Sequence, residues 1–381
     1  MQQTHGGRSR LIVIGNPVAD LVSGEAGQPG ATYKLGGAVG YTGVGAAIMG
    51  ESLVDVVVIS KAPLDHEDPY GVNYFKTVNR PGVSVVRREP TDNRLTIFHN
   101  TYTADGVRTQ KCIPNPQPIT LKDIIDSGLV LRRDDIVIHA STFQDSDPSL
   151  IEGLSKLVDT QIGIVQGFAR AVDQEGTVRP TVPTELLKVA KYLHAIALSE
   201  EDIAGIKDES GNSILDELIT SGVEYTLLTK GPEGAEIFRR GTEFPTVFRQ
   251  PAYELVSEEK KRLATPGPHV DAAFTGLGDT WIAHYGLRMA GWGYSLLETW
   301  EEKHNAVAEA VQSAGLACTL KLRKALSGGK GGIEGAPSLD EWHRVYQGEV
   351  HQPGFAEFAE LAKQAQYEVN VYFPANARER R

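Results

Sequence analysis

Short apolar runs rich in β-branched residues recur through the first two thirds of the chain. They lack the alternation of apolar and polar positions that marks a strand with one wet face. A run of this kind indicates a strand buried on both sides, as in a parallel sheet covered by helices. Such strands are predicted at residues 11–15, 54–60, 135–141, 161–167 and 223–229.

Stretches with helical periodicity lie between and after these runs. They predict helices at about residues 37–49, 148–158, 183–190, 200–219, 279–290 and 293–322. Strand and helix therefore alternate along the chain. This alternation favours an α/β fold with a doubly wound, mainly parallel sheet flanked by helices.

One region breaks the alternation. Residues 80–113 hold three strand-like runs, which are separated by the turn signals TDN and ADG and have no helix between them. The pattern predicts a small antiparallel sheet inserted into the α/β chain, a β lid formed from about residues 16–35 and 80–113. An insertion of this kind serves as a lid over a site or as an interface between two copies of the chain.

The sequence predicts three segments along the chain. We expect one domain over residues 10–326, a glycine-rich linker at 327–338 and a short helical C-terminal extension at 339–381. No internal repeat at a spacing of 20 to 50 residues is present in the sequence, which argues against a solenoid.

The charge balance narrows the classes of partner. The formal net charge is -11, and the sequence has no long basic cluster, so neither nucleic acid nor an anionic membrane surface is an expected partner. No run approaches the roughly 18 apolar residues of a membrane span. The polar N-terminus lacks the apolar core of a signal peptide. Two cysteines far apart, Cys112 and Cys318, fit a reduced, cytoplasmic setting.

The strongest chemical signal is the sequence TGLGD at 275–279, which runs directly into an apolar helix. A glycine turn at that place aims backbone N–H groups outward at the positive end of the helix, where a phosphate is stabilised. Asp279 stands in the first turn. A carboxylate there is either a helix cap or a base beside an anion hole, and the spacing alone favours neither.

A T-G-x-G-D motif that opens a helix, about 240 residues after a Gly-Gly pair, resembles the signature of the ribokinase-like (PfkB) carbohydrate kinases. The inositol-kinase-like members are the most similar. The resemblance implies that Asp279 is the catalytic base and that Gly276, Leu277 and Gly278 form the anion hole for the γ-phosphoryl group. The family usually reads D-T-x-G-A-G-D, whereas Ala273 and Phe274 stand here at the first two positions. In relatives, the first aspartate helps to shape a monovalent-cation site.

Other stretches resemble the parts of the family that bind the acceptor. Most of their residues also have an ordinary structural explanation: tight packing for Gly36 and Gly37, the solvent-exposed face of a sheet for Asn100, and a surface ion pair for Arg170. Arg170 stands at a strand end, where α/β folds bind ligands. The acceptor-binding residues implied by the resemblance are Asp20, Gly36, Gly37, Asn100 and Arg170.

The nucleotide side is matched more weakly. Glu201 is retained from the family's N-x-x-E motif, although Leu198 replaces the asparagine, and the resemblance implies that Glu201 holds Mg²⁺ through water. Without the family, Ser199 to Asp202 is simply a helix N-terminus, and the T-x-G-x-x-G motif at 229–234 suits a hairpin turn. The implied ATP-binding residues are Thr229, Gly231, Gly234 and Asn305.

Together these features predict an ATP-dependent kinase that phosphorylates a small molecule, a sugar or polyol similar to inositol, with Mg²⁺ as cofactor. Because 274–279 also resembles the F-x-G-x-G-D loop of pyridoxal kinases, a pyridoxal or nucleoside kinase is an alternative. A ligand-binding protein with a decayed kinase site is another. A nicotinamide-dependent dehydrogenase is disfavoured, since the first strand is not followed by G-x-G-x-x-G. A homodimer through the β lid is expected by analogy.

Overall fold

The chain is described here by a computed structural model. The residues that the structure describes are 9–26, 28–50, 54–102, 108–208, 210–240, 246–250, 252, 255, 257–263, 276–291, 293–326, 335–338, 341 and 368–371.

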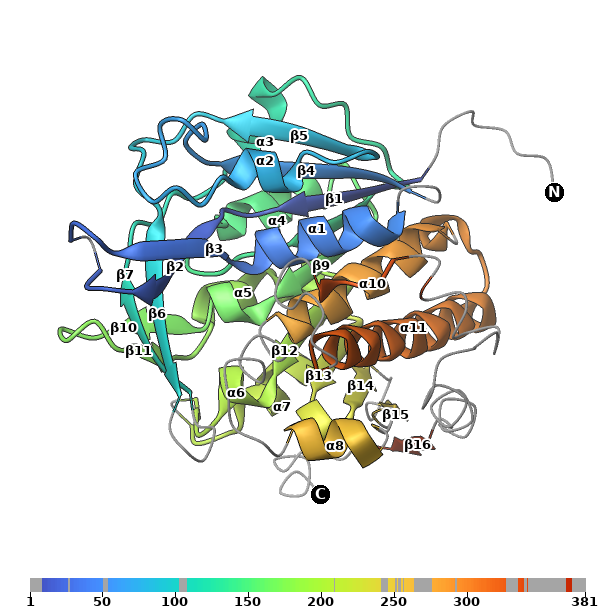
Figure 1. Cartoon of the computed structure of the whole chain (residues 1–381). Coiled ribbons are helices and arrows are strands. Elements are labelled where there is room, and N and C mark those ends of the chain that lie inside the picture. Colours follow the sequence, from blue (N-terminus) through green and yellow to red (C-terminus); the bar gives the residue numbers. More distant parts are fainter. Residues whose placement is uncertain are drawn as a thin grey trace.

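A ten-stranded sheet forms the centre of the molecule (Figure 1). Seven neighbouring strands, from β5 to β13, run parallel, and the last three strands continue the sheet in antiparallel pairs. This arrangement confirms the predicted fold class. In spatial order the strands are β5 (Val83–Arg88), β4 (Asp55–Lys61), β1 (Arg10–Ile14), β8 (Ile136–His139), β9 (Thr160–Ile164), β12 (Ala195–Ser199), β13 (Tyr225–Thr229), β14 (Ala235–Arg239), β15 (Thr246–Gln250) and β16 (Glu368–Val371).

Helices cover both faces of the sheet. The reason is visible in β1, where successive side chains point to opposite faces. Leu11 and Val13 belong to the core shared with α1, α10 and α11, whereas Ile12 and Ile14 belong to the core shared with α3 and α4. The helices are α1 (Ala38–Gly50), α2 (Tyr74–Val78), α3 (Leu121–Asp126), α4 (Pro148–Leu154), α5 (Thr184–Val189), α6 (Glu200–Ile203), α7 (Ile214–Thr220), α8 (Ser257–Leu263), α10 (Leu277–Gly291) and α11 (Trp300–Leu326), with 3₁₀ turns at Val165–Gly167, Ala190–Tyr192, Gly231–Glu233 and Tyr294–Leu296.

A second sheet of four strands lies beyond the carboxyl ends of the parallel strands, at the left of Figure 1. Its spatial order is β3 (Thr32–Gly36), β2 (Val18–Ser23), β6 (Thr96–Tyr102) and β7 (Arg108–Ile113). We call these four strands the lid sheet. The hairpin of β10 (Arg170–Val172) and β11 (Val178–Pro180) lies nearby, since Lys111 of β7 forms a bridge with Thr177.

The prediction for residues 80–113 was wrong in two respects. Val83–Arg88 does not join the lid sheet, because it pairs in parallel with β4 at the edge of the main sheet. The lid sheet is also not purely antiparallel, since β2 and β6 run in the same direction.

Two predicted helices have different bounds in the structure. The helix expected at 200–219 splits into α6 and α7, because the intervening segment turns at Gly205 and Gly211, which have φ of 71° and 82°. Asp208 stabilises that turn by accepting hydrogen bonds from the amides of Ser210 and Asn212. The helix expected at 293–322 begins at Trp300, where the side chains of Thr299 and Glu302 cap its first turn.

The C-terminal segments are only partly described. Within the expected linker, Ala336 is buried beside Gly45 of α1. The Glu341 carboxylate accepts a hydrogen bond from the Ser338 amide, and the Glu341 amide donates to the Ser338 hydroxyl. Glu341 also forms an ion pair with Lys324 of α11. The expectation of a helical extension was wrong for 368–371, which form β16 against β15. The remainder of the predicted linker and extension lies outside the described residues.

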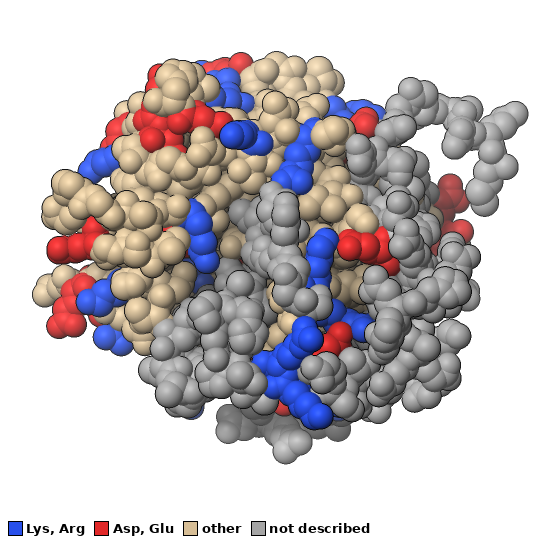
Figure 2. Space-filling view, in the orientation of Figure 1, with Lys and Arg blue, Asp and Glu red and all other residues tan. Residues whose placement is uncertain are grey.

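The described surface carries both signs of charge. In the view of Figure 2, acidic and basic side chains are interspersed. Across the described ranges, none of the helices combines the length and the apolar character needed to cross a bilayer.

The close approach of the chain just after β1 and just after β8 gives a test of the fold. A side chain at Gly15 would place its Cβ 2.3 Å from the carbonyl oxygen of Ala140, which is backbone and cannot rotate away. We expect Gly15→Ala to lower the free energy of unfolding by about 1–3 kcal/mol through overpacking. The measurement is urea unfolding followed by circular dichroism.

Gly45→Ala is the matched control, because its Cβ would meet Ala283 Cβ at 3.5 Å, an ordinary contact, inside a helix. There the alanine should be neutral or stabilise by up to about 1 kcal/mol. Equal effects of the two substitutions would contradict the proposed crowding at Gly15.

Candidate active site

The loops at the ends of β1 and β8 are held together by one buried carboxylate, that of Asp145. Its Oδ2 accepts from the amide of Asn16 at 2.8 Å, and its Oδ1 accepts from the Thr142 amide at 2.8 Å and the Phe143 amide at 3.2 Å. The Ser141 hydroxyl also donates to Oδ1. Burial raises the pKa of Asp145, and the hydrogen bonds from Ser141 and Asn16 oppose that rise. These bonds fix the strand ends at which a ligand site is expected in an α/β fold.

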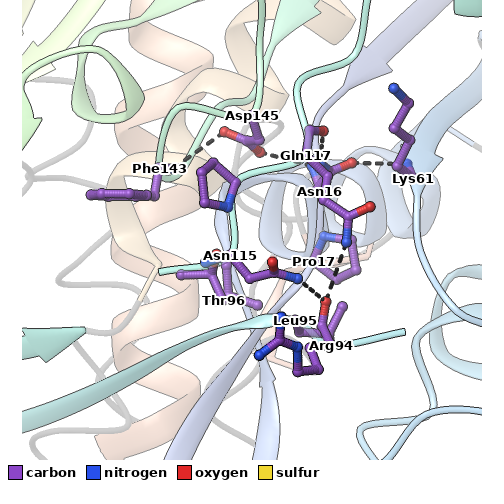
Figure 3. Close-up of a pocket in the computed structure, with 12 residues that line it drawn as sticks. Asn16, Pro17, Lys61, Arg94, Leu95, Thr96, Asn115, Gln117, Phe143 and Asp145 are labelled. Atoms are coloured by element: carbon purple, nitrogen blue, oxygen red, sulfur yellow. Dashed lines mark hydrogen bonds between the residues drawn. The ribbon is translucent and has the colours of Figure 1, made fainter. Parts of the chain in front are cut away.

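Asn16 extends the same network to β4 (Figure 3). Its side-chain oxygen accepts from the Lys61 amide at 2.8 Å, and its Nδ2 donates to the Gln117 carbonyl at 2.7 Å. The Lys61 ammonium is 2.9 Å from Asp123, which completes the capping box of Thr120 at the start of α3. Lys61 therefore links the end of β4 to the loop after β1 and to the start of α3.

A small pocket opens beside Asn16, between the ends of β1 and β4 and the start of β6 (Figure 3). None of the predicted site residues lines it, so it adjoins the predicted site without being part of it. Its lining residues are Asn16, Pro17, Val18, Lys61, Arg94, Leu95, Thr96, Asn115, Pro116, Gln117, Phe143 and Asp145.

The Gly36–Gly37 pair joins the lid sheet to the start of α1. Gly37 has a φ of 91°, which glycine adopts without strain. The next amide, that of Ala38, donates to Thr142 Oγ1 at 2.7 Å. A Cβ on Gly36 would lie 2.4 Å from a carboxyl oxygen of Asp20. The turn therefore requires glycine at residue 37, and the close approach of Asp20 requires it at residue 36.

One face of the lid sheet carries the predicted acceptor residues. Asp20 and Phe98 are paired in register, and side chains two residues apart on a strand share a face, so Asn100 lies on the same face as Asp20. The guanidinium carbon of Arg170 lies 5.8 Å from the centre of the Phe98 ring, on this face. The structure thus brings three of the predicted residues to one surface.

Further contacts orient the polar groups of this face. Asn100 Oδ1 accepts from Gln110 Nε2 at 2.7 Å, across the strand pair. Arg170 is buried, and with the Gln166 amide oxygen facing it, both terminal nitrogens donate to that oxygen. Burial raises the pKa of the neighbouring Cys112 to about 12, against the lowering effect of Arg170, so its thiol is neutral.

The glycine turn opens α10 as the sequence predicts. Gly276 has a φ of 69°, and α10 begins at Leu277, which places Asp279 in the first turn. The amides of that turn have no carbonyl partner within the helix. Asp279 is half-buried and Gly278 is exposed. Thr275 and the two residues that depart from the family pattern, Ala273 and Phe274, lie outside the described residues.

The start of α10 lies against the start of α1. A Cβ on Gly276 would be 2.3 Å from the Tyr41 ring, and the Thr42 hydroxyl donates to the Asp279 carbonyl at 3.5 Å. Because Tyr41 is four residues after Gly37, these contacts lie only about 6 Å along α1 from the glycine pair. The two glycine motifs, far apart in the sequence, thus lie close together where α1 and α10 begin.

The predicted donor residues follow the neighbouring strands β12 and β13. Ser199 and Thr229 are paired in register at the two strand ends, and Glu201 stands in the first turn of α6, directly after β12. Thr229 Oγ1 donates to the Leu198 carbonyl at 3.3 Å. Asp202 accepts from the amide and hydroxyl of Ser199, which caps α6 as an ordinary helix start would require.

The T-x-G-x-x-G motif forms the turn of the hairpin β13–β14. Gly231 and Gly234 both have positive φ, of 52° and 98°. Among the described residues, no atom of another segment lies within 4 Å of a Cβ built on Gly231. Asn305 is exposed in the second turn of α11. These donor assignments stay predictions.

Sequence reasoning missed a buried lysine at this site. Lys321 of α11 donates through Nζ to the Gly276 carbonyl and to Thr280 Oγ1, each at 3.0 Å. The available signal was its position, since Lys321 stands in the apolar stripe of a long helix, four residues after the buried Ala317 and four residues before the buried Ala325. Asp145 and Tyr41 were missed as well, because their roles depend on contacts with distant segments.

No protein-family model and no curated protein matches the chain. Solved structures match it over most of its length. A pyrophosphate-dependent kinase in the ribokinase family, complexed with a pyrophosphate analog and myo-inositol, has a TM-score of 0.59 at 18% identity and covers 85% of this chain and 97% of its own. Ribokinase from Arabidopsis thaliana, complexed with ribose and ATP, has a TM-score of 0.58 at 17% identity, covering 89% and 98%.

A third structure has a similar score. Aminoimidazole riboside kinase from Salmonella enterica, complexed with aminoimidazole riboside and an ATP analog, has a TM-score of 0.58 at 16% identity and covers 88% of this chain and 98% of its own. Likeness at such identities is a likeness of fold. The chain therefore has the ribokinase-like fold that its sequence predicts.

Proposed function

We propose that this protein is a small-molecule kinase that transfers the γ-phosphoryl group of ATP to a hydroxyl of a sugar or polyol. One observation carries the proposal. The Gly276–Asp279 turn at the mouth of α10 packs against the first turn of α1, directly after Gly36 and Gly37. Gly36 in turn lies against Asp20 of the lid sheet, so this packing supports a shared site for a carboxylate, the amides of a helix start and the acceptor face.

The proposed reaction asks for positioning and electrostatics more than covalent chemistry. Asp279 accepts the proton of the acceptor hydroxyl as its oxygen forms a bond to the γ-phosphorus, and the bond to the β-phosphate oxygen breaks. The amides of Leu277 and Gly278 stabilise the charge on the transferring group. The products are a phosphate ester and ADP.

The acceptor is proposed from the face of the lid sheet. Asp20 and Asn100 supply the oxygen and amide groups that bind hydroxyls, and Arg170 supplies a planar set of donors. The structures with similar folds include complexes with myo-inositol and with ribose. An inositol-like polyol or a sugar is therefore the proposed acceptor class.

The donor is proposed to lie over the ends of β12 and β13. Open space at Gly231 admits the phosphates of a nucleotide. The exposed carboxylate of Glu201, in the first turn of α6, fits Mg²⁺ held through water, because Mg²⁺ keeps several of its waters. The ion would supply charge neutralisation between the phosphates, and ATP oxygens would provide its direct ligands.

Two proposals of lesser scope complete this assignment. The lid sheet ends in the edge strand β3, and an edge strand offers unpaired backbone groups to a second copy. A homodimer through the lid sheet is accordingly proposed, as is a cytoplasmic location.

The proposed base gives the first functional test. Asp279→Asn keeps the shape of the side chain but cannot accept the hydroxyl proton, so we expect kcat to fall about 10²- to 10⁴-fold. ATP affinity should change little, because the backbone amides are retained. Coupled detection of ADP measures kcat, and calorimetry measures ATP binding.

Glu309→Gln, at an exposed position of α11, is the matched loss of a carboxylate. It should retain wild-type turnover. Wild-type kcat in the Asp279→Asn variant would remove Asp279 from the reaction.

The acceptor and donor are tested with a panel. Polyols, sugars, pyridoxal and nucleosides are offered as acceptors, each with ATP or pyrophosphate as donor, and the phosphorylated product is identified by mass spectrometry. We expect the highest kcat/KM with a polyol or sugar and ATP. A preference for pyridoxal or a nucleoside would overturn the acceptor class, and a preference for pyrophosphate would overturn the donor.

Gly36 tests the placement of Asp20. Because an added Cβ would lie 2.4 Å from the Asp20 carboxylate, Gly36→Ala should displace that carboxylate. A displacement of about 1 Å can cost on the order of 10²-fold, so we expect kcat/KM for the acceptor to fall about 10- to 100-fold, with KM for ATP nearly unchanged. Gly45→Ala on α1 is the control. An equal rise in KM for both substrates would refute a role confined to the acceptor.

A further inference from the structure

A lysine is buried beneath the glycine turn, at a position where its helix otherwise presents apolar side chains. Lys321 is 1% exposed, and Ala314, Ala317 and Ala325, which share its side of α11, are buried as well. Burying an ammonium group is costly unless its charge is compensated. A leucine or methionine would fill the same volume without that cost, so the charge itself calls for an explanation.

The contacts of Lys321 converge on one carbonyl. Nζ donates to the oxygen of Gly276 and to Thr280 Oγ1, while the Thr280 hydroxyl and amide both donate to the same Gly276 oxygen, at 2.8 and 3.0 Å. The ammonium also lies 4.9 Å from the centre of the Tyr41 ring, a cation–π distance. The lysine therefore contacts both α10 and α1 where the two helices begin.

The charged and titratable groups around Lys321 come from each of these elements. Tyr41 faces it from α1, Asp279 and His284 from α10, and Cys318 from its own helix. Burial lowers the pKa of Lys321 to about 8, while Cys318 and Asp279 act to raise it. Burial lowers the pKa of His284 to about 3, with help from Arg288 and Lys321, so this histidine is neutral near pH 7.

The bond to Gly276 has a geometric consequence for the next amide. In a planar trans peptide the C=O and the N–H point in opposite directions. Holding the Gly276 oxygen toward α11 therefore turns the Leu277 N–H away from α11. Cys318 acts in the same way one peptide later, since its Sγ donates to the Leu277 carbonyl at 3.1 Å and so turns the Gly278 N–H outward.

We propose that Lys321 is a positioning residue for phosphoryl transfer, a fixed internal cation that orients the amides of the glycine turn and attracts the Asp279 carboxylate. This inference rests on the kinase function proposed above. Its positive charge also favours the build-up of negative charge at the mouth of α10. Lys321 touches neither substrate in this arrangement, because the turn lies between them.

The first test replaces the charge while keeping the volume. Lys321→Met should lower kcat about 10- to 100-fold, the range found when groups that orient a reacting centre are removed, with KM for the acceptor changed less than about threefold. Lys324→Met is the control, because Lys324 lies in the same helix, is partly exposed and pairs with Glu341. Circular dichroism and urea unfolding verify that both variants fold.

The pH profile separates a charge effect from a packing effect. Lys321 is charged below its pKa and neutral above it, so wild-type kcat should fall as the pH rises through about 8. The Lys321→Met variant should lack this decline and stay at its low value from pH 7 to 9.5. Should neither Lys321 variant fold, the wild-type profile still decides, and a flat profile over this range refutes the proposal.

Chemical rescue provides an independent readout. Lys321→Ala leaves a space beside Gly276 into which methylammonium can donate hydrogen bonds, so added methylammonium should restore part of kcat in a saturable way. Tetramethylammonium, which has no N–H group, should restore none. Full kcat in a folded Lys321→Met variant, or equal losses in Lys321→Met and Lys324→Met, would overturn the proposal.

The two proposals can fail separately. Wild-type protein that phosphorylates no acceptor of the panel with any donor sinks the kinase function, and the role of Lys321 falls with it. An active wild-type protein whose kcat is insensitive to Lys321→Met sinks only the role of Lys321.

Discussion

The candidate site depends on the packing of Gly276 against the ring of Tyr41. That contact permits no side chain at residue 276 and sets the mouth of α10 beside the mouth of α1. The mouth of α1 is in turn fixed by the bond from the Ala38 amide to Thr142, whose own amide is bound by Asp145. A continuous series of contacts thus runs from the strand ends to the turn that carries Asp279.

A buried ionisable side chain lies at each end of this series of contacts. Asp145 is surrounded by amides and a hydroxyl at the strand ends, and Lys321 by a carbonyl, a hydroxyl and an aromatic ring beneath the turn. Each group has hydrogen-bond partners that offset part of its desolvation cost, and neither is cheaper than an apolar side chain of equal volume. Such groups fix a particular loop conformation, which a reaction governed by positioning requires.

The fold was predictable because the strands around β1 are buried on both faces and read as continuous apolar runs. Val83–Arg88 was misplaced because it is an edge strand with mostly partial burial, so its sequence resembles that of an exposed sheet. The role of Lys321 could not be assigned from the sequence, because the sequence shows only its neighbours on α11. Its hydrogen-bond partners, Gly276 and Thr280, belong to a segment more than 40 residues earlier in the chain, and only the fold brings them to it.

The glycines of the two motifs divide into two kinds, and the division bears on the proposed chemistry. At Gly36 and Gly276 the space of the missing side chain is taken by the protein itself, by the Asp20 carboxylate and the Tyr41 ring. At Gly231 and Gly278 no atom of the described chain lies within 4 Å of an added Cβ. Packing accounts for the first pair and not for the second. Open space beside backbone amides at Gly278 is what a transferring phosphoryl group needs, so the second pair supports the proposed path of the phosphates.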